Sequence, residues 1–137
     1  EETPRDAFPR DWAMLRNNLG GMLAELAAMK SAPALYVQAA DEYRKALDVF
    51  NPDDAPFDWA RATGALGETL LEAGKLGKDS ALLQQAKEIL DQTVEIWKVF
   101  GDEKRTRSAE LLASEAQLAL LSLDVDKRLK EAGGAKN

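Results

Sequence analysis

The sequence predicts an all-α protein made of two copies of a helix pair followed by one further helix. The first observation is a repeat, because Asp11-Trp12-Ala13 returns 47 positions later as Asp58-Trp59-Ala60. The second is a recurrence of apolar residues at steps of three and four, which is the period of an amphipathic helix. The third is a composition dominated by Ala and Leu, both of which favour helix. A fixed period of this length is typical of arrays that stack similar helix pairs.

The first repeat, at about residues 11–52, holds two predicted helices. Residues 1–10 carry Pro4 and Pro9 without a helical period, so we expect a loop there. The first helix is expected at about 11–30, with its apolar stripe facing the core. This stripe consists of Trp12, Leu15, Leu19, Met22, Leu26 and Met29. The second helix is expected at about 33–50, with Pro33 in the first turn, where its missing N–H costs nothing.

The second repeat, at about residues 56–101, follows a run of turn-forming residues at 51–56. We expect its helices at about 56–73 and 79–100, with Gly74 as a C-cap and Gly101 as the stop. The last helix, at about 102–131, carries charges on one side and is expected to cap the array. Residues 1–137 then form one domain. Because residues 6–9 resemble the linker at 54–57, we interpret the chain as a piece of a longer protein.

The repeat resembles the tetratricopeptide repeat, whose motif pairs a Leu-Gly in the first helix with small residues in the second. Leu19-Gly20 and Leu66-Gly67 match the first part, and Ala39 and Ala86 match the second. The period departs from the family, since it is 47 here against 34. The Trp also stands one turn earlier, as in elongated repeats of bacterial proteins. The resemblance covers about residues 9–101 and implies a short right-handed solenoid.

The resemblance also implies a function, namely binding of a protein or peptide on the concave face lined by the first helix of each pair. In the first repeat the implied positions are Met14, Asn17, Asn18, Gly21, Ala24 and Glu25. In the second repeat they are Arg61, Gly64, Ala65, Glu68, Leu71 and Glu72. Asn amides can both donate to and accept from a peptide backbone. The alternative interpretation is an ordinary solvated helix face.

Two other sets of residues leave alternatives open. Trp12 and Trp59 could be binding platforms, but their place on the apolar stripe favours a core role. The last helix carries a second apolar stripe that includes Leu111, Leu118, Leu121 and Val125. That stripe is either buried or offered to a missing repeat, a second copy of the chain or a bound helix. The alternative function is therefore an oligomerisation or structural segment of a longer repeat array, with contacts through the chain ends and the last helix, where Leu118 could join copies into a homo-oligomer.

Composition argues against other functions. The net charge of −6 disfavours nucleic acid, because phosphate contacts need a basic face. The chain has no His and no Cys, which removes the usual general base, the thiolate and the commonest metal ligands. Asp53, Asp54 and Asp58 lack the pattern of a calcium loop. We therefore expect no enzyme activity, no cofactor, no metal and no membrane insertion. A cytoplasmic location is favoured.

The repeated glycine gives a first prediction. Glycine inside a helix costs about 1 kcal/mol relative to Ala, so two at matched positions indicate a close helix crossing. Replacing Gly20 by Leu should overpack that crossing and lower the free energy of unfolding by about 1–3 kcal/mol. Thermal or urea unfolding measures the change. An unaltered melting temperature would mean that no close crossing exists.

Overall fold

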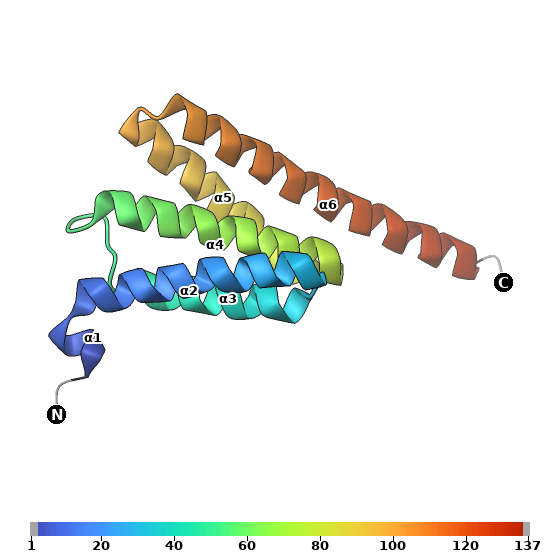
Figure 1. Ribbon diagram of the computed structural model, residues 1–137. Helices are drawn as coiled ribbons and strands as arrows, with labels where there is room; N and C mark the ends of the chain where they lie inside the picture. The colour runs from blue at the N-terminus through green and yellow to red at the C-terminus, as the bar shows by residue number, and fades with distance from the viewer. Residues whose placement is uncertain (1–2, 136–137) are drawn as a thin grey trace.

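The computed structural model describes residues 3–135, and every regular element in that range is an α-helix (Figure 1). A short first helix precedes two helix pairs and one long last helix. The helices are α1 (Pro4–Ala7), α2 (Pro9–Lys30), α3 (Pro33–Leu47), α4 (Pro56–Gly77), α5 (Ser80–Phe100) and α6 (Glu103–Ala135). The all-α class and the two pairs followed by a single helix are therefore confirmed.

Each helix from α2 to α6 packs on its neighbours in the sequence. The pairs α2–α3 and α4–α5 are joined by packing of α3 on α4, and α6 lies on α5. Helix α4 also touches α2 and α6, whereas α2 and α6 make no contact with each other. Figure 1 shows α2 and α3 at one end of the stack and α6 at the other. Within residues 3–135, the two ends of the stack therefore do not close on each other.

The helix boundaries follow from capping. Asp79 caps α5, because its carboxylate accepts hydrogen bonds from the backbone N–H groups of Ala81 and Leu82. Gly101 ends α5 in the left-handed conformation at φ 73°, as the sequence predicts. The prediction of a loop over residues 1–10 is wrong for residues 4–7 and 9–10, which are helical, and residues 1 and 2 lie outside the described part of the chain. Pro4 and Pro9 instead stand in the first turns of α1 and α2, where a proline is tolerated.

Three other predicted boundaries also differ. Helix α3 ends at Leu47, earlier than residue 50, and α6 continues beyond residue 131 to Ala135. Gly74 does not cap α4, which continues to Gly77 and ends with Lys78 in the left-handed conformation. Gly74 is buried inside the helix, where an added Cβ would lie 2.7 Å from Leu83 Cγ and 3.0 Å from the Leu83 backbone nitrogen. This glycine therefore serves helix packing and not chain reversal.

The apolar stripe of the first long helix does not face the core. The buried residues of α2 are Ala13, Gly20 and Ala27, and they pack on α3. Most of the predicted stripe is exposed, and Met29 reaches 83%. The exposed members are Leu15, Leu19, Met22, Leu26 and Met29. Small residues face α3 because the two helices approach closely, so the large apolar residues lie on the opposite side.

Gly20 of α2 and Gly67 of α4 each leave a notch in the helix surface, and a large side chain of the paired helix fills it. A Cβ added at Gly20 would lie 2.9 Å from Tyr43 Cε1, and one added at Gly67 would lie 2.9 Å from Leu90 Cγ. Tyr43 and Leu90 are themselves 47 residues apart, so the two pairs repeat the same contact. The sequence pattern placed Ala39 and Ala86 opposite the glycines, but the nearest atoms belong to the residues one turn later.

A polar clamp reinforces only the first pair. Arg16 of α2 donates a hydrogen bond of 3.1 Å to Glu42 of α3, and Lys45 donates a second bond of 2.9 Å. Burial by itself would raise the pKa of Glu42, but the bonds from Lys45 and Arg16 outweigh it and hold the pKa below its ordinary value. The second pair has Thr63 and Ile89 at the corresponding positions, so it lacks this clamp.

Two glycine substitutions should have opposite effects on stability. In Gly74→Ala the new methyl group meets the backbone of Leu83, so we expect a loss of about 1–3 kcal/mol despite the better helix propensity of Ala. In Gly21→Ala the nearest atom is Tyr43 Oη at 3.7 Å, an ordinary contact, so stability should rise by up to about 1 kcal/mol. Urea unfolding of both variants measures the difference. Equal effects of the two substitutions would contradict the buried position of Gly74.

Candidate functional site

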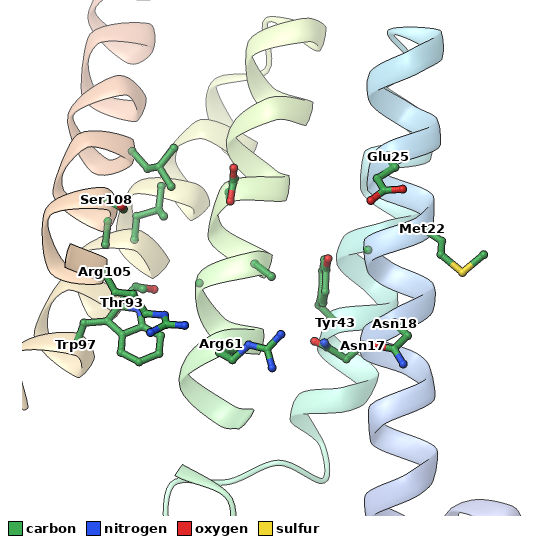
Figure 2. A pocket seen from close by; sticks show the side chains of 17 residues that line it. Asn17, Asn18, Met22, Glu25, Tyr43, Arg61, Thr93, Trp97, Arg105 and Ser108 are labelled. Carbon is green, nitrogen blue, oxygen red and sulfur yellow. The ribbon is translucent and has the colours of Figure 1, made fainter. Parts of the chain in front are cut away.

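A groove of about 620 Å³ opens between the first helices of the successive pairs (Figure 2). Helices α2, α4 and α6 form its walls, while α3 and α5 supply residues to its floor. The lining consists of Asn17, Asn18, Gly21, Met22, Glu25, Tyr43, Arg61, Gly64, Ala65, Glu68, Leu90, Thr93, Trp97, Arg105, Ser108, Ala109 and Leu112. Residues from five helices therefore meet in one hollow.

Most of the residues implied by the repeat resemblance line this groove. They are Asn17, Asn18, Gly21, Glu25, Arg61, Gly64, Ala65 and Glu68. Ala24 and Glu72 line a smaller hollow beside the groove, and Met14 is half exposed outside both. Leu118, predicted as a contact of the last helix, is exposed on α6 and also lies outside the groove. Leu71 is fully buried in the core, so its assignment to a binding surface is wrong.

The sequence pattern missed the contribution of α6. Arg105, Ser108 and Ala109 extend the groove beyond α4. They follow Arg61, Gly64 and Ala65 by 44 positions, and this shortened period is the signal that could have identified them. At the full period of 47, Arg61 and Ala65 correspond to Ser108 and Leu112, which also line the groove, whereas Gly64 corresponds to Leu111, which is 69% exposed and lies outside it. Helix α6 therefore acts as a third groove wall.

One end of the groove is positively charged. The Arg105 guanidinium lies 5.0 Å from the centre of the Trp97 ring and is held by Asp102 through a hydrogen bond of 2.7 Å. Arg61 lies 5.9 Å from the Phe57 ring and forms no salt bridge with any residue in the described part of the chain. Figure 2 shows the Arg61 side chain extending toward Asn17 and Asn18 on α2. A cation without a carboxylate partner is available to an acidic ligand group.

The other end of the groove is acidic. It continues into a second hollow of about 290 Å³ that shares Glu25 and Glu68 with the first and adds Glu72. Lys75 pairs with Glu72 at 3.0 Å and with Glu115 at 3.2 Å. In contrast, neither Glu25 nor Glu68 forms a salt bridge within residues 3–135.

The pKa of Glu68 reflects the acidic surroundings at this end of the groove. Removal of water by the surrounding walls raises the pKa of Glu68 above its ordinary value, and the nearby carboxylates of Glu72 and Glu115 raise it further. Lys75 opposes the shift without cancelling it. The acidic end therefore favours anything that brings a positive charge, whether a proton or a basic ligand group.

The groove also contains a buried hydrogen-bond acceptor that has no donor among the described residues. Asn17 Oδ1 is buried and accepts no hydrogen bond from any described residue. A buried carbonyl oxygen without a donor costs free energy that a ligand N–H group can recover. Among the described residues, no group of three or more acidic side chains is placed to hold a metal ion. The arrangement offers amides, separated charges and apolar floor residues, which together suit binding.

No protein-family model, no curated protein and no solved structure matches this chain. None of the helices within residues 3–135 has a stretch long and apolar enough to cross a lipid bilayer.

The raised pKa of Glu68 predicts a pH-dependent gain in stability for Glu68→Gln. A carboxyl whose folded pKa exceeds its unfolded pKa makes the folded state less stable as pH rises through that window. The Gln variant should therefore be more stable than the natural chain near neutral pH, and this difference should vanish below the unfolded pKa of about 4.3. Urea unfolding at several pH values measures it.

Glu110→Gln is the control for this measurement, because it removes the same charge from an exposed part of α6 outside the groove. If both variants gain equally, the effect comes from net charge and not from the environment of Glu68.

Proposed function

We propose that this chain is a binding module of the tetratricopeptide-like kind, which holds an extended segment of a partner protein in the groove between α2, α4 and α6. The observation that carries this proposal is the convergence of Asn17, Arg61 and Glu68, from two different helices, on one open hollow. A right-handed solenoid of helix pairs accounts for the way in which successive first helices share one face.

The groove favours a ligand with separated charges. Arg61 and Arg105 would attract an acidic group, while Glu25 and Glu68 would attract a basic one. Between them lie Gly21, Gly64 and Ala65, whose small side chains leave room for the ligand. The preferred partner segment is therefore apolar in its middle, acidic at one end and basic at the other. Rigid helices on both sides keep the groove preformed, so little ordering entropy is lost on the receptor side.

Catalysis is not proposed. The chain has no His and no Cys, and the lining of the groove holds no Lys that could act as a base or nucleophile. The carboxyl with the raised pKa, Glu68, stands beside no such group in the lining. Reversible recognition through hydrogen bonds and charge is the function that these side chains support best.

Peptides selected from a random displayed library for binding to the natural chain test the proposal. We expect the selected peptides to be enriched in segments with opposite charges at their two ends. Asn17→Ala combined with Arg61→Ala should weaken their binding at least about tenfold, because hydrogen bonds to charged groups contribute about 1.5–3 kcal/mol each. Fluorescence polarisation measures the affinity, and the helical circular dichroism signal should stay unchanged.

Two further variants complete the test. Gly21→Gln places a long side chain in the groove beside Tyr43 without a clash at Cβ, so it should also block binding. Gln92→Ala combined with Arg107→Ala is the matched control, because it removes one amide and one arginine from exposed positions outside the groove. If binding survives both groove variants, or is lost equally in the control, the assignment of the groove is wrong.

A further inference from the structure

The exposed apolar face of α2 lies mostly outside the groove, and only Met22 belongs to the groove lining as well. We call it the α2 stripe, and its side chains are between 37% and 83% exposed. It consists of Leu15, Leu19, Met22, Leu26 and Met29. At 3.6 residues per turn, this stripe lies on the opposite side of the helix from Ala13, Gly20 and Ala27, which pack on α3. The stripe therefore faces away from its own helix pair.

The internal repeat shows what such a face does when it is covered. The residues 47 positions after the α2 stripe are Ala62, Leu66, Thr69, Ala73 and Leu76. The first four of these are buried, and three of them, Ala62, Leu66 and Ala73, lie in clusters with residues of α3. Ala62 clusters with Ala46 of α3 and with Phe50 just beyond its end, and Ala73 clusters with Tyr36 of α3. The equivalent face of α4 is thus covered by a packed helix.

A second unpartnered face lies at the other end of the stack. We call it the α6 stripe, and its side chains are between 50% and 69% exposed. It consists of Leu111, Leu118, Leu121, Val125 and Leu129. Helical spacing places it opposite Ala109 and Ala116, the residues that α6 buries. Because α2 and α6 make no contact, the two stripes cannot meet within one copy (Figure 1).

We propose that the α6 stripe of one copy docks on the α2 stripe of a second copy, so that copies of this chain join head to tail. The stripes are similar in length, about 21 Å for α2 and about 27 Å for α6, and neither contains a charged residue. Each carries five large apolar side chains in one row. Single exposed apolar residues are common on monomers, but a continuous apolar patch typically marks an interaction surface.

Side-chain size fits this occupant. Leu15 and Leu26 stand where α4 has Ala62 and Ala73, so a helix on the α2 stripe must lie farther out than α3 lies from α4. The α6 stripe offers leucines that reach across this larger separation. Ser114 and Ser122, which lie among the leucines on the exposed side of α6, leave room for protruding side chains of the facing helix.

The two surfaces of this interface differ, so association does not close after two copies. Unlike surfaces at opposite ends of a molecule generate an open chain or a ring. The mean mass of the 137-residue chain in solution is therefore expected to rise with concentration. Nine of the ten stripe residues lie outside the groove lining, and Met22 is the one that belongs to both surfaces.

Two single variants test the proposal by complementation. Met22→Glu places a charge on the α2 stripe, and Leu118→Glu places one on the α6 stripe, both at positions about two-thirds exposed where folding is not disturbed. Light scattering measures the mass of each variant alone and of an equal mixture. We expect each variant alone to be monomeric, with self-association weakened at least tenfold. The mixture should form one-to-one dimers that do not grow further, because the only intact α6 stripe meets the only intact α2 stripe.

Each other result overturns the proposal. A natural chain that stays monomeric at high concentration would show that the stripes are covered by something other than a second copy. If Met22→Glu alone still forms dimers, then α6 pairs with α6, and if Leu118→Glu alone does so, then α2 pairs with α2. Lys87→Glu, on the partly exposed side of α5 outside both stripes, is the control and should assemble like the natural chain.

Discussion

The contact of a large side chain with a glycine at the crossing of each helix pair is the constraint on which the rest of this structure depends. Gly20 accepts the ring of Tyr43, and Gly67 accepts the side chain of Leu90. Without a Cβ at either position the helices of each pair can approach closely. The same contact also builds the site, because the Tyr43 ring that fills the notch at Gly20 continues into the floor of the groove, with its hydroxyl beside Gly21.

Two charged groups of the groove lack the ion pairing seen in the clamp formed by Arg16, Glu42 and Lys45. Arg61 and Glu68 have no salt-bridge partner among the described residues, and the pKa of Glu68 is raised by loss of water and by neighbouring carboxylates. Binding sites typically retain such unfavourable groups because a ligand, and not the fold, completes them.

Position in the stack explains why equivalent helices look so different. Helix α4 has neighbours on both sides and buries ten residues, among them Leu66, Leu70 and Leu71. Helix α2 buries only Ala13, Gly20 and Ala27, although its sequence repeats that of α4. A repeat unit cannot bury its apolar face alone, so the first and last helices of a stack expose what an internal helix covers.

The sequence by itself determined the helical class, the number of long helices and the stop at Gly101, because periodicity, capping and glycine chemistry are local properties of the chain. The resemblance to the tetratricopeptide repeat implied the helix face that carries Asn17, Arg61 and Glu68, and these three residues line the groove. Tertiary structure alone decided which apolar residues are buried. The periodicity of α2 identified its row of large apolar residues but not whether that row faces the core. Close packing against α3 buries the small residues of α2 and leaves the large ones exposed. The third wall from α6 was not predicted, because α6 matches the repeat too poorly to indicate which of its sides faces the groove, and its packing on α5 decides that.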